Sequence, residues 1–122
     1  MKVRDYECDM QGIVNNAIYQ HYLEHARHEY LESKGFSFAE LTRQGIIVVV
    51  VRAELDYKAS LSAGEEFTVS VSAHQASRVR LVFNQEIRRK EGGELAVQAV
   101  ITATSLNQRK RPYFPAELSA IL

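Results

Sequence analysis

The spacing of hydrophobic residues along the chain changes near residue 46, from a helical repeat to an alternating one. Between residues 16 and 34, apolar side chains recur every three or four positions, which places them on one face of an α-helix. Asn15 or Asn16 can cap its first turn, and Gly35 suits the left-handed position that ends a helix. The buried stripe of this long helix is expected to comprise Ile18, Tyr19, Tyr22, Leu23, Ala26, Tyr30 and Leu31.

Beyond a short helix at residues 37–44, the pattern becomes that of β-strands. The β-branched run Ile46–Val51 favours a buried strand over a helix. Farther on, apolar residues alternate with polar ones, as in a half-buried strand. Short turns join the segments, so we expect antiparallel neighbours. The four strands predicted here cover residues 46–58, 67–72, 79–90 and 94–106.

Residues 2–6 are predicted to form a further strand, followed by a loop over residues 7–14. This strand starts abruptly, so we expect the natural strand to be longer. The fold class is then α+β, with a long central helix packed on a curved five-stranded antiparallel sheet. Residues 1–122 form one domain, and the Val-rich strand edges favour a dimer.

Composition excludes some classes of function but does not identify the function. The 122 residues include 15 basic and 15 acidic side chains, a balance that argues against a nucleic-acid binder. The single cysteine, Cys8, fits a reducing cytoplasm. No apolar run is long enough to suggest a membrane span, and the charged first residues do not predict a signal peptide.

The segment with the clearest chemistry lies just before the long helix. Asp9 precedes Gly12, and both precede the helix start at Asn16. A helix N-terminus presents free N–H groups that can hold a carbonyl oxygen as it becomes negative. A neighbouring carboxylate can attack that carbonyl or orient a water, without a metal or cofactor. The alternative is that Asp9 is a turn or cap residue.

The same segment resembles the signature of the 4-hydroxybenzoyl-CoA thioesterase family of hotdog proteins. The resemblance is nearest to plant methylketone-synthase-type acyl carrier protein thioesterases and their bacterial relatives. It extends to Asn15-Asn16-Ala17 and to His25-Ala26-Arg27-His28-Glu29. The positions that match the signature are Tyr6, Asp9, Gly12, Ile13, Val14 and Tyr19.

The resemblance implies a hotdog fold and hydrolysis of an acyl thioester by Asp9, acting as nucleophile or general base. It also implies that the backbone N–H of Asn16 polarises the thioester carbonyl. Many bacterial members carry His at this position, and Asn cannot serve as a base at neutral pH. Substrate contacts are expected from Gly12, Ile13, Val14, Asn15 and Tyr19.

The resemblance further implies an acyl-CoA or acyl carrier protein substrate, bound along the interface of a homodimer or homotetramer. Arg78 and Arg80 would contact the phosphates of coenzyme A, or belong to a solvated strand face. The basic runs at 88–90 and 109–111 would meet an acidic carrier protein, or simply flank turns.

Other residues admit two interpretations each. His21, His25 and His28 share a helical spacing, but without carboxylate or cysteine partners we expect no metal site. His25, Arg27 and His28 are expected to serve helix packing or a subunit interface. The Ile46–Val51 run and Phe83 line an acyl channel or form plain core.

Two rival functions remain open from the sequence. A hotdog dehydratase or hydratase would pair its carboxylate with a nearby histidine, whereas the nearest one downstream of Asp9 is His21. A non-catalytic acyl-binding module would not need the set formed by Asp9, Gly12 and Asn16.

Overall fold

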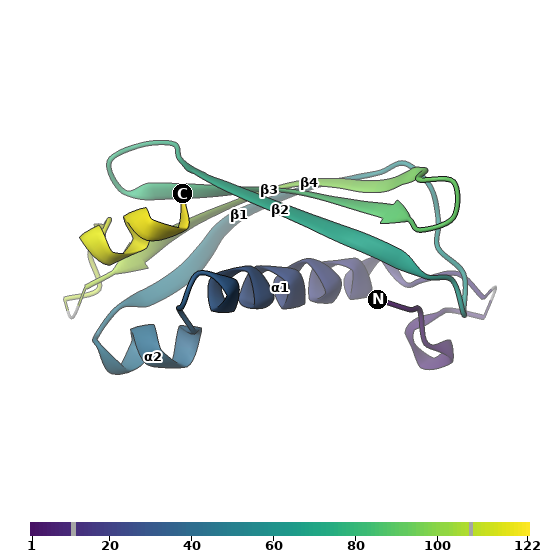
Figure 1. The fold of residues 1–122 in the computed structure, drawn as a ribbon, viewed down its shortest axis with the longest axis horizontal. Coiled ribbons are helices and arrows are strands. Elements are labelled where there is room, and N and C mark those ends of the chain that lie inside the picture. Colours follow the sequence, from purple (N-terminus) through teal and green to yellow (C-terminus); the bar gives the residue numbers. More distant parts are fainter. Residues whose placement is uncertain (11, 108) are drawn as a thin grey trace.

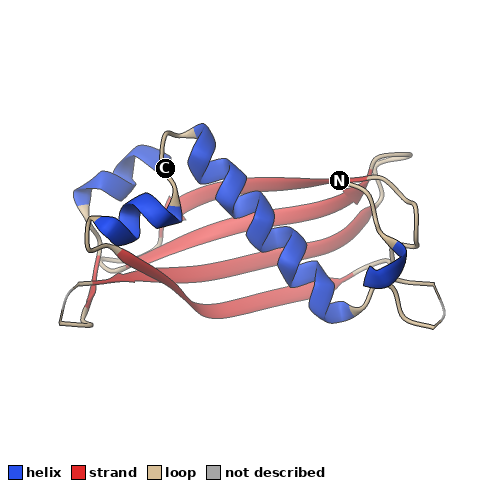
Figure 2. Ribbon diagram, turned by 90° about the horizontal axis from the view of Figure 1, so that it is seen from below, coloured by secondary structure: helices blue, strands red, loops and turns tan. Residues whose placement is uncertain are grey.

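The computed structural model describes residues 1–10, 12–107 and 109–122. One face of an antiparallel sheet, with strand order β1-β4-β3-β2, carries the long helix α1, which crosses the strands diagonally (Figure 1, Figure 2). This is the predicted α+β arrangement. The elements are η1 (Asp5–Glu7), α1 (Asn16–Ser33), α2 (Phe38–Arg43), β1 (Ile47–Tyr57), β2 (Phe67–Gln75), β3 (Arg80–Arg89), β4 (Leu95–Leu106), β5 (Pro112–Tyr113) and η2 (Ala116–Ile121).

Helix α1 begins and ends where its capping residues predict. The side chain of Asn15 accepts a hydrogen bond from the N–H of Ala17, and Gly35 has a φ of +87° just beyond the last turn. The predicted stripe is buried at Tyr19, Tyr22, Leu23, Ala26 and Leu31, while Ile18 and Tyr30 are half-buried. Arg27 joins the buried face, where hydrophobic spacing alone would not place it.

The prediction that strands joined by short connections are antiparallel neighbours is confirmed for β2 with β3 and for β3 with β4, but it is wrong for β1 and β2. These two strands lie at opposite edges of the sheet, because β1 pairs with β4. β2 pairs with β3 from Phe67 opposite Arg89 to Gln75 opposite Leu81, and β4 lies between β3 and β1. Phe67 is buried, and Val69 and Val71 are half-buried against the core, as their alternation with polar neighbours indicates. The core therefore lies between α1 and the inner sheet face.

The strand predicted at residues 2–6 is wrong. Lys2 forms a single bridge with Glu66, and the chain then enters the 3₁₀ helix η1. The carboxylate of Glu7 accepts from the N–H of Arg4 at 2.9 Å, which closes a turn where an extended strand would have to continue. The fifth strand of the sheet is instead β5, which pairs with β4 through Tyr113 opposite Ser105.

The expectation that the Ile46–Val51 run is buried is also wrong for most of the run. Ile46 is buried, but Ile47, Val50 and Val51 are 42%, 50% and 47% exposed. β1 pairs with β4 alone, so its outer edge has no neighbouring strand among the described residues. A bulge between Val50 and Arg52 leaves Val51 without a partner in the register with β4.

Candidate active site

Asp9 lies on a tight hairpin that leads into α1. The N–H of Asp9 donates to the carbonyl of Ile13 at 2.9 Å, and the N–H of Gly12 donates to the carbonyl of Asp9 at 3.0 Å. Cys8 and Val14, the residues that flank this pair of hydrogen bonds, form an antiparallel β-bridge. Gly12 has a φ of +79°, a conformation that glycine adopts without strain, so it lets the chain reverse here. The Asp9 side chain is exposed.

The hairpin delivers the chain directly to the start of α1. The N–H of Asn15 donates to the carbonyl of Glu7 at 3.1 Å, which fixes the capping residue to the other arm of the hairpin. Asn16 is the first helical residue and is exposed. Within the described chain its N–H has no acceptor, as is usual in the first turn of a helix. An exposed carboxylate and an open helix start are thus joined by one short hairpin.

The segment between β1 and β2 holds this hairpin against the protein. The N–H of Val14 donates to the carbonyl of Leu61 at 2.8 Å, and the N–H of Ala63 donates to the carbonyl of Gly12 at 3.2 Å. The hydroxyl of Tyr19 accepts from the N–H of Leu61 at 3.0 Å. The pattern of the sequence gave no sign of this brace, because the two segments are almost fifty residues apart.

Tyr19 and Val14, two of the predicted substrate contacts, are buried. Tyr19 is 2% exposed, and its ring packs edge-on to Tyr22 at a centroid distance of 6.2 Å. Burial raises the pKa of the Tyr19 hydroxyl, so it stays protonated. In this structure Tyr19 supports the hairpin, while Gly12, Ile13 and Asn15 are the predicted contacts with accessible surface.

Glu7 is a functional candidate that the sequence pattern did not single out. Its carboxylate accepts from the hydroxyl of Tyr22 at 2.9 Å, in addition to the N–H of Arg4. Burial and this contact raise the pKa of Tyr22, so the hydroxyl remains a donor. Glu7 therefore fastens the hairpin to α1 through both its side chain and its backbone carbonyl.

Cys8 packs behind the hairpin and does not behave as a nucleophile. Its Sγ lies 3.8 Å from the carbonyl oxygen of Arg4, and the residue contacts the core. Burial raises the pKa of the thiol, with nearby carboxylates acting in the same direction. The thiolate that nucleophilic attack requires is thus disfavoured.

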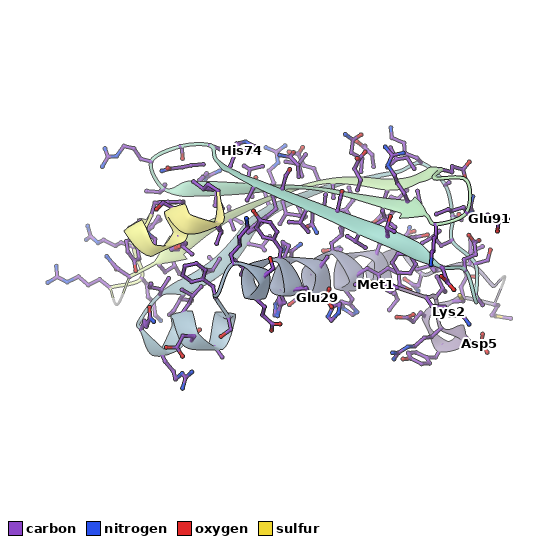
Figure 3. All side chains as sticks on the ribbon, in the orientation of Figure 1. Met1, Lys2, Asp5, Glu29, His74 and Glu91 are labelled. Atoms are coloured by element: carbon purple, nitrogen blue, oxygen red, sulfur yellow. The ribbon has the colours of Figure 1, made fainter. Side chains whose placement is uncertain are left out.

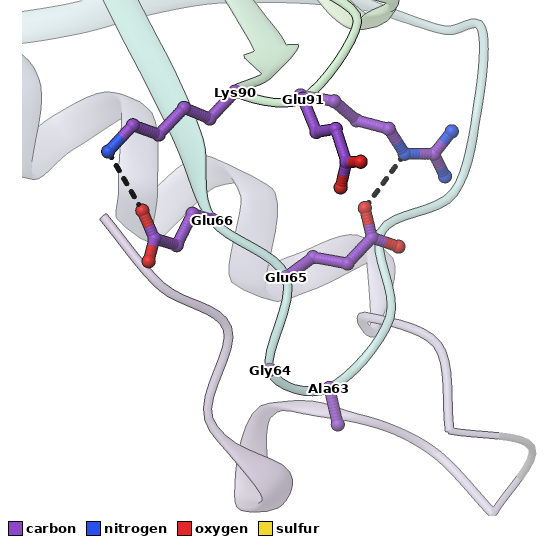
Figure 4. Close-up of a pocket in the computed structure, with 7 residues that line it drawn as sticks. Ala63, Gly64, Glu65, Glu66, Lys90 and Glu91 are labelled. Atoms are coloured by element: carbon purple, nitrogen blue, oxygen red, sulfur yellow. Dashed lines mark hydrogen bonds and ion pairs between the residues drawn. The ribbon is translucent and has the colours of Figure 1, made fainter.

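A charged cavity of about 650 Å³ lies beside the brace, lined by residues 63–66 and 89–91 (Figure 4). Arg89 contacts Glu65 at 2.8 Å and also pairs with Glu94, while Lys90 contacts Glu66 at 3.0 Å. The basic run at 88–90 is therefore neutralised within the chain and does not form a free cationic patch.

Arg78 and Arg80 are exposed and lie at the opposite end of the sheet from Asp9. Figure 3 shows His74, near the end of β2, well away from Asp5, which lies toward one end of the molecule. β2 begins at Phe67, beside the brace, and its nine residues span about 26 Å. These arginines therefore cannot share a small site with the Asp9 of their own chain.

A groove runs along α1 on the side of β1. Its first section, of about 450 Å³, starts at Ala17 in the first turn and is walled by Val50 and Ala53 of β1. Its second section, of about 400 Å³, is lined by Val48 and Phe83 among others. Glu24, Arg27 and Val50 line both sections, so the two are continuous.

Neither a cluster of metal-ligating side chains nor a membrane-spanning helix is found among residues 1–10, 12–107 and 109–122. No three His, Cys, Asp or Glu side chains of this part gather as metal ligands would. His25 instead contacts Glu29 at 2.8 Å, and His28 contacts Glu24 at 3.7 Å. Within the same part, no helix is both long and apolar enough to cross a membrane.

Comparison with known proteins gives one family. The model of the Thioesterase-like superfamily matches residues 3–122. The chain is 37% identical over 112 residues to the chloroplastic acyl-acyl carrier protein thioesterase ATL2 of Arabidopsis thaliana, covering 92% of this chain and 60% of that protein. It is 31% identical over 102 residues to the long-chain acyl-CoA thioesterase FadM of Escherichia coli, covering 84% and 76%. The chain thus spans about 60% of the length of its plant relative.

Solved structures agree on the fold. A hypothetical protein of Aquifex aeolicus superposes with a TM-score of 0.92 at 30% identity, covering 100% of this chain and 95% of that one. The DHNA-CoA thioesterase of Staphylococcus aureus superposes with a TM-score of 0.86 at 31% identity, covering 98% and 84%. The hotdog fold predicted from the resemblance is confirmed.

Proposed function

We propose that this chain, which belongs to the Thioesterase-like superfamily, hydrolyses acyl thioesters to a carboxylic acid and a thiol. The observation that supports this most directly is the hairpin that joins the exposed Asp9 to the open start of α1. The plant relative and the bacterial relative both bear thioesterase names, which agrees with this proposal.

Asp9 supplies the carboxylate of the reaction. As a general base it takes a proton from water while the water oxygen bonds to the thioester carbon. As a nucleophile it forms an anhydride with the acyl group, which water then hydrolyses. In both routes the C–S bond breaks and the sulfur leaves as thiolate, to be protonated as thiol. Both routes need an ionised carboxylate with access to the substrate, and the exposed position of Asp9 suits either one.

The backbone N–H of Asn16 stabilises the negative charge that develops on the carbonyl oxygen. The partial positive charge of the helix N-terminus adds to this hydrogen bond. Asn15 keeps the N–H of Ala17 occupied, which leaves Asn16 as the donor nearest the hairpin. The role belongs to the backbone, so the side chain at position 16 need not act as a base.

The acyl chain enters the first section of the groove, where Ala17 and Gln20 face Val50 and Ala53. This section starts next to Asn16, so a carbonyl bound there directs its acyl chain along α1. The apolar β1 wall suits a hydrocarbon tail. The groove is open on the side of β1, so it needs a second surface to enclose the acyl chain.

A second copy of the chain supplies that surface, and we place it at the edge of β1. This edge presents unpaired backbone groups together with the exposed Ile47, Val50 and Val51. In such a dimer, phosphate contacts from Arg78 and Arg80 would reach a site of another subunit and not their own. Both coenzyme A and an acyl carrier protein fit this scheme as the thiol part of the substrate.

Thiol release from a panel of acyl-CoAs by the wild type and Asp9→Asn tests the proposal. Asn keeps the shape of the side chain but removes the base and nucleophile, so we expect a loss of about a hundredfold or more. Asp5→Asn, an identical change at an exposed position of the same segment, is the matched control and should retain activity.

Equal thiol release by wild type and Asp9→Asn would show that Asp9 is structural. If the wild type releases no thiol from any acyl-CoA, the same comparison is made with acyl carrier protein thioesters. Water addition to an enoyl thioester without thiol release would replace the proposal by a hydratase. Acyl-thioester binding without any turnover would replace it by a binding module.

A further inference from the structure

Arg27 is a buried cation in the middle of α1. It is 9% exposed, and one of its guanidinium nitrogens donates to the side-chain carbonyl of Gln85 at 3.0 Å. The amide of Gln85, itself 1% exposed, donates to the carbonyl of Leu23 at 3.0 Å. Burial lowers the pKa of Arg27, although arginine remains charged. The neutral Gln85 orients the guanidinium without balancing its charge.

No carboxylate of the described residues lies within ion-pair distance of Arg27. Glu24 of the same chain acts on it only from farther away and offsets part of the effect of burial on its pKa. A buried charge without a counter-charge is unfavourable, and folded proteins almost always supply one. Guanidinium groups offer five N–H donors, of which the Gln85 contact uses one. Arg27 lines both sections of the groove, so an acceptor can approach it from there.

Glu24 stands one helical turn from Arg27 on the same groove wall. Its side chain is 58% exposed and contacts His28 at 3.7 Å, while its charge reaches Arg27 of the same chain only at longer range. Ala17, Gln20, Glu24 and Arg27 follow a three-to-four spacing, so they form one stripe along α1. That stripe borders the groove beside the open edge of β1, which carries the exposed Val50. It has no covering element among the described residues.

We infer that the stripe packs against the stripe of a second copy, with Glu24 of each subunit paired to Arg27 of the other. A two-fold axis makes every contact reciprocal: if residue 24 meets residue 27 of the partner subunit, residue 27 meets residue 24. The acidic and basic members on one stripe are therefore self-complementary. Each buried Arg27 gains a carboxylate in direct contact, and each exposed Glu24 becomes buried in the interface.

Charge favours a second copy over a small anionic ligand as the occupant of this part of the groove. Glu24 borders both groove sections together with Arg27 and would repel a free anion. A two-fold partner brings one carboxylate and one guanidinium to the same place, which leaves no charge unpaired. Ile47 and Val50 supply the exposed apolar surface that the core of such an interface needs.

The inference rests on the proposed dimer and explains how the acyl groove is enclosed. The first section of the groove begins beside Asn16 and ends at Arg27. A partner helix locked at Glu24 and Arg27 covers the far end of that section and leaves its start near Asp9 accessible. The two ion pairs thus set where the acyl chain must stop.

Charge reversal with mixing tests the reciprocal pairs. Glu24→Arg places two arginines on the stripe, and Arg27→Glu places two glutamates, so each variant alone repels its own copy. We expect the dissociation constant of either homodimer, measured by sedimentation, to rise at least about a hundredfold. Mixed in equal amounts, the two variants carry opposite charges at both contacts and should recover a dimer.

The mixture distinguishes contacts between subunits from contacts within one chain. Mixing does not change the like charges within each chain, so a recovered dimer must come from opposite charges across the interface. Glu32→Arg makes the same charge change on an exposed part of α1 outside the groove, and should dimerise as the wild type does. Should Arg27→Glu fail to fold, as judged by circular dichroism, Glu24→Arg combined with Arg27→Met replaces it. That double variant should dimerise at least about tenfold more tightly than Glu24→Arg alone.

A Glu24→Arg variant that dimerises like the wild type would overturn the inference, as would a mixture no more dimeric than its components. Neither result would touch the thioesterase proposal, which depends on the loss of thiol release in Asp9→Asn. A wild type that is monomeric in solution would overturn the dimer and the ion pairs together, and again leave the Asp9 test to stand separately.

Discussion

The two outer strands of the sheet, β2 and β1, meet the solvent in different ways. The start of β2 is closed by the first residues of the chain: the terminal ammonium donates to the carbonyl of Phe67 at 2.9 Å, and the N–H of Phe67 donates to the carbonyl of Met1. Its outward positions are polar, for example Ser70 and Ser72. β1 has no such cover, and its exposed positions include Val50 and Val51.

This difference supports the proposed dimer, in which β1 and not β2 meets a second copy of the chain. Soluble proteins protect edge strands with charge, polar side chains or covering segments. β2 has two of these protections. β1 instead offers branched apolar side chains next to a groove lined by the buried Arg27, which has no carboxylate of the described residues in direct contact. Association of two copies at β1 removes both features at once.

The largest effect is expected from a charge placed on β1. Val50→Lys puts an ammonium group at the centre of the proposed interface and near Arg27, so we expect the dimer to weaken at least a hundredfold, or about 2.7 kcal/mol. Ser72→Lys makes a comparable change on β2 and should leave the dimer intact. Sedimentation of both variants and the wild type gives the measurement. If both lysine variants weakened the dimer equally, β1 and β2 would not differ in their role in dimerisation.

A smaller effect, on the free energy of unfolding, is expected at Tyr22 of α1, which contacts both the hairpin and β2. The Tyr22 ring packs on Phe67 at a centroid distance of 4.6 Å, while its hydroxyl donates to Glu7. Tyr22→Phe keeps the ring and loses the hydrogen bond to a carboxylate, so the free energy of unfolding should fall by about 1.5–2 kcal/mol. Urea titration measures this.

The matched control is Tyr6→Phe, whose ring is 75% exposed. Its change in unfolding free energy should stay within about 0.5 kcal/mol. A Tyr22→Phe protein as stable as the wild type would mean that Glu7 does not fasten the hairpin.

The smallest effect concerns acid pH at the start of β2. Burial raises the pKa of Glu65, but the hydrogen bond from Arg89 outweighs it, so the net pKa lies below its usual range. A lowered folded pKa contributes stability that is complete above the unfolded pKa of about 4.3 and is lost as pH falls through the folded value. The free energy of unfolding should therefore decline below about pH 4.3.

Glu65→Gln should flatten this decline, because the variant has no carboxyl to protonate at position 65. Urea titrations between pH 3 and 6 compare the two proteins. The difference is expected to be small, since both partners of the ion pair are about a third exposed. An identical decline in both proteins would assign acid sensitivity to other carboxylates.

The sequence by itself determined the parts of the protein that depend on neighbouring residues. The apolar repeat and the flanking Asn15 and Gly35 were sufficient for α1, since a helix is built from contacts three and four residues apart. Alternation and turn residues were sufficient for the positions of the long strands along the chain, but not for which strands pair, since β1 and β2 are not neighbours. The order of Asp9, Gly12 and Asn16 predicted a carboxylate beside a helix start, since that arrangement also spans few residues.

Only the tertiary structure decided which elements are edges, which polar groups are buried and which candidates share a site. The Ile46–Val51 run has the composition of a central strand but lies at an edge, because strand order is set by pairing across the whole sheet. Arg27 meets Gln85 across 58 residues of chain, and Arg78 and Arg80 follow the end of β2 that is farther from the Asp9 hairpin. These contacts and positions depend on how segments that are distant in the sequence pack together. Local patterns of hydrophobic and polar residues therefore do not predict them.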